Sequence, residues 1–266
     1  MKSFVRQSLC LLVIFVMLLC THHTVFASSN QRTENILKAA TGVQYVSQKV
    51  AKAYFYRYLD IRSQQAETDL KEGLDQLKQE LLVLQEHVGT DDEKLVASFL
   101  IDIHTKLAST VSRSFVQENG NFMMDFSESL LEGAKFFAAE HKQQAQGEEE
   151  TMPAEVERQL FLLERINKYY ISHKAGFRND NNVIQLAQSV ANFENGLDKI
   201  NGYKHYPTSA QESVAKINKL WPTAKEFYLG IQQGALPVIV LAATDKLEAE
   251  FHVLLKHHKA MVGSGK

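Results

Sequence analysis

Histidines are the side chains that could bind a metal ion or a haem in this chain of 266 residues. After residue 27, His257 and His258 form the one adjacent pair, and adjacent residues on a helix point in different directions. His104 falls in a predicted helix, where it could be a ligand inside a helical bundle. Single histidines in such positions are more often packed or surface residues. We therefore expect no metal ion and no cofactor.

Carboxylates and thiols give no sign of a catalytic site. The acidic runs Asp91-Asp92 and 148–150 lie in predicted loops, where helix capping and solvated charge explain them. The chain has no Gly-rich phosphate loop, no nucleophile elbow and no HExxH motif. Cys10 and Cys20 both lie in a predicted leader, so the mature chain would have neither a disulfide nor a thiol nucleophile. The sequence favours a protein that is not an enzyme.

Aromatic side chains are better candidates for a ligand site. Tyr54 and Tyr58 belong to a cluster on the first predicted helix, and Trp221 lies on the seventh. Aromatic residues supply much of the buried area of a helical bundle, so most of them should belong to the core. A minority could line a small-molecule pocket between helices.

The first helix that must position these residues is predicted over 36–61. Its apolar or aromatic positions recur in steps of three or four, as one face of a helix requires. They are Ile36, Ala40, Val43, Val46, Val50, Tyr54, Tyr58 and Ile61. The opposite, solvent-facing side is predicted to carry Lys38, Gln44, Lys49, Lys52 and Arg57. A stripe of this length needs partner helices to cover it.

Seven further helices show the same spacing. In the second, Leu77 and Leu81 belong to a heptad seam, and in the sixth Phe193 and Leu197 do the same. The fourth is predicted to bury a stripe that starts at Phe122 after a turn at 119–121. The stripe of the third is predicted at Leu95, Phe99, Ile103, Leu107 and Val111. Capping boxes are predicted at Thr90 with Glu93 and at Ser209 with Glu212.

The resulting fold class is all-α, with two tandem antiparallel four-helix bundles after a cleaved signal peptide. The bundles are predicted at 28–145 and 154–266, with an acidic linker at 146–153. One larger bundle with a long loop at that place is the alternative.

The first 27 residues have the order of a secretory signal peptide. Lys2 and Arg6 precede an apolar run, and small residues lead to a cleavage site after Ala27. The alternatives are an uncleaved membrane anchor and a lipoprotein modified at Cys20. The sequence thus predicts a periplasmic or secreted protein, without a transmembrane helix in the mature chain. The net charge of −2 and the lack of a basic stripe argue against binding of nucleic acid.

Residues 40–54, ATGVQYVSQKVAKAY, resemble the N-terminal (PilJ-type) sensor module of type IV pili methyl-accepting chemotaxis transducers. The matching residues are Ser47, Gln48, Ala51, Lys52, Ala53 and Tyr54. The stretch RQLFLLERINKYY repeats the motif more weakly in the second half, with matches at Arg165, Ile166, Lys168 and Tyr170. Trp221 with Lys225 is similar to the tryptophan-containing later helix of the module. The resemblance covers about 33–258, in two tandem copies.

The resemblance implies a periplasmic helical bundle that senses a ligand or a protein partner. In the related NarX-type nitrate sensors, arginines of the first helix bind the anion. Gly42 and Gln44 stand at those places here, and Arg158 is a candidate for one of them in the second copy. We therefore expect no nitrate binding by the first bundle. The candidate ligand-binding residues are Gln44, Ser47, Gln48, Tyr54, Tyr58, Arg158 and Trp221.

The function predicted from the sequence is that of an exported, non-enzymatic, sensor-like binding protein in signal transduction. Its partner would be an unknown small ligand or another envelope protein. A structural or adhesive helical envelope protein is the first alternative. An enzyme or haem carrier built on a bundle is the second.

Overall fold

The computed structural model describes residues 2–142, 151–234 and 236–263, with side chains from Asn30 to Met261. The described residues form eight α-helices, one short 3-10 helix and no strand, so the protein is all-α. The helices are α1 (Lys2–Tyr58), α2 (Ser63–His87), α3 (Asp91–Val111), α4 (Gln117–Lys142), α5 (Met152–Lys174), α6 (Asp180–Gly202), α7 (Thr208–Leu229), η1 (Gly230–Gln232) and α8 (Pro237–Gly263).

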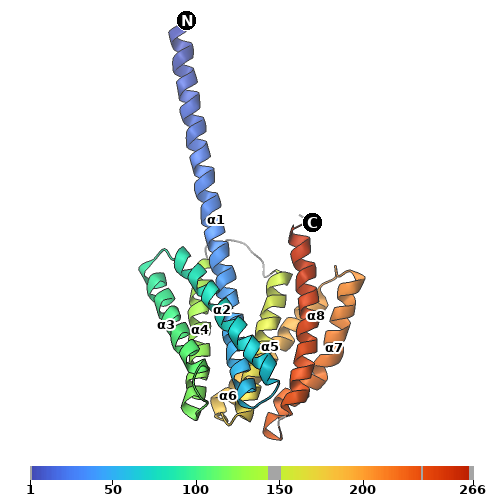
Figure 1. Ribbon diagram of the computed structural model, residues 1–266. Coiled ribbons are helices and arrows are strands. Elements are labelled where there is room, and N and C mark those ends of the chain that lie inside the picture. Colours follow the sequence, from blue (N-terminus) through green and yellow to red (C-terminus); the bar gives the residue numbers. More distant parts are fainter. Residues whose placement is uncertain (1, 143–150, 235, 264–266) are drawn as a thin grey trace.

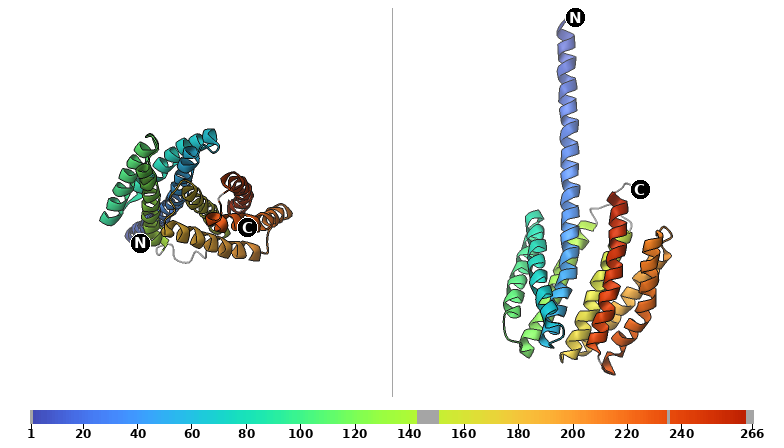
Figure 2. Two further views of the ribbon diagram at one scale, coloured as in Figure 1. Left: turned by 90° about the horizontal axis from the view of Figure 1, so that it is seen from below. Right: turned by 45° about the vertical axis from the view of Figure 1, so that its right-hand side comes forward.

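The helices pack in two groups that meet along α1 and α5 (Figure 1, Figure 2). In the first group each of α1 to α4 packs on the next, and α4 returns to α1. In the second group α5 to α8 pack in the same way, and α8 returns to α5. The buried apolar side chains form one cluster that continues across the α1–α5 boundary. Whether the two groups fold separately stays a prediction, and residues 146–150 of the predicted linker lie outside the described residues.

Helix α1 confirms most of the predicted stripe, because Ile36, Val43 and Val50 are fully buried. It is also buried outside that stripe, because α2, α4 and α5 all pack on it. For this reason Lys52, which we predicted on the solvent-facing side, is only 5 % exposed. That prediction was wrong. Tyr58, at the end of the helix, is 43 % exposed.

The N-terminal part of α1 extends beyond the other helices (Figure 1). The side chains of the predicted leader lie outside the described residues, so its cleavage stays a prediction. Where the structure describes the chain, none of its helices carries an apolar stretch of the length that a membrane crossing needs.

Helix α3 buries the C-terminal part of the predicted stripe. Ile103, Leu107 and Val111 are buried, whereas Leu95 and Phe99 are 71 % and 51 % exposed. A step of four residues turns a helix by roughly 40° beyond a full turn, so a stripe with this spacing moves gradually around the helix. In the N-terminal half the buried face carries Ala97 and Leu100 instead. The prediction was therefore wrong for Leu95 and Phe99 alone.

Helix α4 begins earlier than predicted. It starts at Gln117, so the predicted turn at 119–121 is helical. Gly120 serves packing there, because a Cβ atom at this position would lie 2.2 Å from the Phe177 ring. Phe122 is 38 % exposed, and its neighbour Met123 takes the buried position.

The seams of α2 and α6 and one of the two caps are confirmed. Leu77, Leu81, Phe193 and Leu197 are buried. Thr90 and Glu93 form a complete capping box at the start of α3. The predicted box of Ser209 with Glu212 is wrong, because α7 begins at Thr208 with Pro207 as its N-cap.

Leu77 and Leu82 make a matched pair for testing the seam of α2, because Leu77 is fully buried and Leu82 is 44 % exposed. Leu77→Ala should lower the free energy of unfolding by about 2–5 kcal/mol, since it leaves a cavity in the core. Leu82→Ala should change it by less than about 1 kcal/mol. Urea unfolding measures both, and equal losses would contradict the assignment of this face.

Candidate functional site

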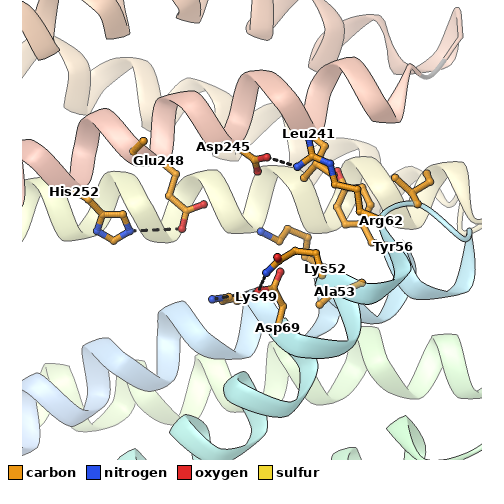
Figure 3. A pocket seen from close by; sticks show the side chains of 14 residues that line it. Lys49, Lys52, Ala53, Tyr56, Arg62, Asp69, Leu241, Asp245, Glu248 and His252 are labelled. Carbon is orange, nitrogen blue, oxygen red and sulfur yellow. Dashed lines mark hydrogen bonds and ion pairs between the residues drawn. The ribbon is translucent and has the colours of Figure 1, made fainter.

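A pocket of about 370 Å³ lies between α1 and α2 of the first group and α8 of the second. Figure 3 shows side chains from both groups facing each other across it. Its charged lining residues are Lys49, Lys52, Arg62, Asp69, Asp245 and Glu248. Helix α8 packs mainly on α5 and α7. The pocket is therefore the space that α8 leaves open beside α1 and α2.

The turn between α1 and α2 brings Arg62 to the pocket. Asp60 and Arg62 both have a positive φ, of 54° and 50°. This left-handed conformation costs a residue other than glycine about 1–2 kcal/mol. Arg62 is the N-cap of α2 but makes no side-chain cap. Its guanidinium reaches across the pocket instead and pairs with Asp245 of α8.

Each remaining cation at the pocket also has a carboxylate partner. Lys49 lies 3.9 Å from Asp69, which is beyond direct hydrogen-bond distance. Lys52 is directed into the core, where its Nζ lies 2.7 Å from Glu164 Oε2 of α5. Glu248 accepts a hydrogen bond of 2.8 Å from the Tyr45 hydroxyl. The nearest ring nitrogen of His252 is 3.7 Å from the same carboxylate.

The charges beneath the pocket change one another's proton affinity. Burial disfavours the ammonium of Lys52, but Glu164 and Glu248 outweigh burial and raise the pKa of Lys52. Burial, together with repulsion from Glu248, holds the pKa of Glu164 above its usual value despite Lys52. Burial also disfavours the Glu248 carboxylate, but His252, Lys52 and Tyr45 together lower its pKa to about 2. Glu248 is thus ionised at neutral pH.

Tyr56 contributes a buried hydroxyl to the pocket wall. Its side chain is 3 % exposed, and its hydroxyl has no hydrogen-bond partner among the described residues. Burial raises the pKa of Tyr56 well above its usual value, and the nearby Tyr228, Glu164 and Asp245 act in the same direction. The group is therefore a neutral hydroxyl. A buried polar group without a partner costs about 1–3 kcal/mol.

A second buried charge cluster joins α4 to α5. Arg165 donates two hydrogen bonds to the Glu128 carboxylate, at 2.8 and 2.9 Å. The ammonium of Lys168, which is fully buried, pairs with the same carboxylate. Burial lowers the pKa of Lys168 to about 8, although Glu128 opposes this. Burial alone would raise the pKa of Glu128, but Lys168 and Arg165 lower it to about 2.

The candidate residues on α1 lie outside the pocket lining. Ser47 and Gln48 are fully buried, and Gln48 donates to the Ser127 carbonyl at 3.2 Å. Gln44 is partly buried one turn before Gln48. Tyr54 is buried, whereas Tyr58 is partly exposed, and both rings pack on Phe115. The structure thus brings Tyr54 and Tyr58 together at the end of α1.

The two candidates in the second group lie elsewhere. Arg158 of α5 pairs with Glu155 at 3.3 Å. Trp221 is buried against Phe193, and its Nε1 donates to Glu194 at 3.4 Å. The seven predicted residues do not gather around one cavity, and a ligand-binding role for them stays a prediction.

Two of the histidines considered as metal ligands, His104 and His258, have ordinary hydrogen-bond partners. A ring nitrogen of His104 lies 3.1 Å from the Leu74 carbonyl, and one of His258 lies 3.3 Å from the Tyr206 hydroxyl. Within the described part of the chain, no three His, Cys, Asp or Glu residues are placed to hold a metal ion.

Comparison of the chain with protein-family models, with curated proteins and with solved structures gave no match. The likeness of residues 40–54 to a sensor module therefore stays a resemblance.

Sequence reasoning missed the α8 wall of the pocket. Asp245, Glu248 and His252 are spaced three and four residues apart and so share one face of α8. Lys49 and Lys52 of α1 are spaced in the same way. The complementary charges of these two faces were the available signal. It could not show which helices face each other.

Removing the Lys52 ammonium should strongly destabilise the fold, because Glu164 would be left buried without its cation. We expect Lys52→Met to cost about 3–5 kcal/mol in urea unfolding. The double variant Lys52→Met with Glu164→Gln should recover part of this loss. Lys38→Met removes an exposed cation from the same helix and should change stability by about 0.5 kcal/mol or less. An equal effect of Lys38→Met and Lys52→Met would contradict the buried ion pair.

Acid should destabilise the protein through Glu128 and Glu248. Both have a pKa of about 2 in the folded chain against an ordinary value of 4.5. The unfolded chain binds more protons between these values. The stabilisation is therefore complete above about pH 5 and is lost as the pH falls toward 2. Urea unfolding from about pH 2 to 7 measures this dependence.

In the same experiment, Glu128→Gln should make stability less dependent on pH. Glu132→Gln, which removes an exposed carboxylate from the same helix, should leave the dependence unchanged. Identical profiles for Glu128→Gln and the unmodified protein would contradict the stabilising role of the Glu128 carboxylate.

Proposed function

We propose that this protein is an exported, non-enzymatic, sensor-like binding protein, and that its ligand site is the pocket between α1, α2 and α8. The observation that carries the proposal is the origin of the pocket walls, which come from both helical groups. A ligand in this position would contact both groups at once. Binding would then favour one arrangement of the two groups over others, which is the property that a sensor needs.

The contacts across the pocket are weak enough for a ligand to change the arrangement of the two groups. The ion pair of Arg62 with Asp245 crosses it, and both side chains are about half exposed. Exposed ion pairs of this kind contribute about 0–1 kcal/mol. The Tyr45 hydroxyl adds a hydrogen bond to Glu248. A ligand that fills the gap therefore adds to a weak connection between α8 and the first group.

The finer organisation belongs to the same proposal. Each helical group would be one copy of a PilJ-like antiparallel four-helix bundle, and the leader would be removed near Ala27 on export to the periplasm. The support is the repeated motif, whose lysines Lys52 and Lys168 are both buried and each pair with a glutamate of the other helical group.

Filling the pocket tests the proposed function. Ala249 is exposed and lines the pocket, whereas Ala191 is exposed on α6 outside it. We would measure thermal unfolding of the full chain with small amines, amino acids, carboxylates and sugars, since a ligand of the folded state raises Tm. At least one class should raise Tm of the unmodified protein and of Ala191→Phe, but not of Ala249→Phe. No shift with any class, or an equal shift in both variants, would contradict the proposal.

A further inference from the structure

We infer that the ion pair of Arg62 with Asp245 is a latch that holds the two helical groups closed over the pocket between α1, α2 and α8. This inference rests on the proposed function, because it names what controls access to the same pocket, but its test needs no ligand. Three features carry it, namely the firm joint between the groups at α1 and α5, the weak hold of α8 on the first group, and the strained turn that presents Arg62.

The two groups are joined firmly where α1 meets α5. The buried apolar cluster continues across this boundary. The ion pair of Lys52 with Glu164 lies inside it, with both side chains less than 10 % exposed. The buried cluster of Arg165 and Lys168 with Glu128 also ties α4 to α5. The α1–α5 boundary is therefore the natural axis for a movement of one group against the other.

Helix α8 has a weaker hold on the first group. It packs on α5 and α7, and it reaches the first group through the ion pair of Arg62 with Asp245 and the hydrogen bond of Tyr45 with Glu248. A pocket of about 370 Å³ lies at the same boundary. Moving α8 away from α2 would therefore break far less packing than moving α5 away from α1.

The turn that presents Arg62 has an energetic cost. Asp60 and Arg62 both adopt the left-handed conformation, and Arg62 stands at the N-cap of α2 without capping it. Serine, threonine, asparagine or aspartate at that place would cap the helix. The left-handed conformation of two residues costs more than an exposed ion pair contributes. The arrangement therefore adds little to the stability of the fold, and its effect is to place a guanidinium across the pocket.

The ion pair is accessible enough to open and close. The side chains of Arg62 and Asp245 are 46 % and 45 % exposed, and their contact lies at the pocket (Figure 3). Breaking an exposed pair of this kind changes an equilibrium by up to about fivefold. A change of this size shifts the populations of two arrangements and can be reversed by a ligand that prefers one of them.

The distance between spin labels on α2 and α8 tests the latch in the full chain. We would place the labels at Gln79→Cys and Val253→Cys, which are exposed positions outside the pocket lining. Cys10 and Cys20 are replaced by serine, so that the labels attach at these two positions alone. Electron–electron double resonance then gives the distribution of distances between the two helices.

Three variants are compared with the parent chain. Asp245→Asn breaks the latch. Asp102→Asn is the matched control, because it breaks a similarly exposed pair, that of Asp102 with Lys106 within α3. The exchange Arg62→Asp with Asp245→Arg rebuilds the pair with its charges reversed, and aspartate tolerates the left-handed conformation better than most residues.

The ratio of long to short distances should rise about two- to fivefold in Asp245→Asn. It should stay unchanged in Asp102→Asn and return toward the parent value in the charge exchange. Sodium chloride at 1 M should also raise the ratio in the parent chain, since it shortens the Debye length to about 3 Å. Salt should have no such effect in Asp245→Asn, where the pair is already broken.

An unchanged distribution in Asp245→Asn would overturn the inference and leave the proposed function standing, because the ligand panel with Ala249→Phe tests that function separately. A loss of more than tenfold in the folding equilibrium of Asp245→Asn would also overturn it, since the pair would then be a structural bond. A latch that opens as expected, without any ligand that raises Tm, would contradict the ligand site alone.

Discussion

The ion pair of Lys52 with Glu164 constrains the arrangement of the whole molecule. It joins the central helices of the two groups, and its side chains are only 7 % and 2 % exposed. An ion buried to this degree is stable only with its partner in place, because the desolvation penalty is several kcal/mol for each charge. Helices α1 and α5 must therefore keep one register. The cluster of Lys168, Arg165 and Glu128 acts in the same way between α5 and α4.

Close packing around α1 accompanies these buried charges. Ala39, Ala40, Ala51 and Ala53 are all buried on this helix. Small side chains let neighbouring helices come close, and three helices, α2, α4 and α5, pack on α1. Larger groups fill the end of the helix, where Tyr54 and Phe55 pack with Phe115 and Phe177. The boundary between the groups is thus a packed core with a few paired charges inside it.

The pocket follows from the same constraint. Because Lys52 is committed to Glu164, its charge lies beneath the pocket and makes no ion pair with Glu248. Helix α8 packs on α5 and α7 and leaves a gap beside α1 and α2. The strained turn at Asp60 and Arg62 then places one guanidinium across this gap. Backbone strain of this kind lowers the stability of the folded protein, and strained residues are often found at ligand sites.

The sequence by itself determined the helical class and the approximate position of the helices. The spacing of Leu77 and Leu81 in α2 and of Phe193 and Leu197 in α6 identified buried seams, because each helix has a single apolar stripe. The capping box at Thr90 was also readable, since both partners lie within one turn of the chain. Such features depend on neighbours three or four residues away.

Only the tertiary structure decided which surfaces meet. In the N-terminal half of α3, the position of the neighbouring helices buried Ala97 and Leu100 in place of Leu95 and Phe99. Lys52 is polar and was expected in solvent, but α5 covers it with a glutamate 112 residues away in the sequence. Glu248 and Tyr45 are 203 residues apart and meet through a hydrogen bond at the pocket. Helical periodicity is a local property, whereas these contacts arise from the packing of distant helices around α1.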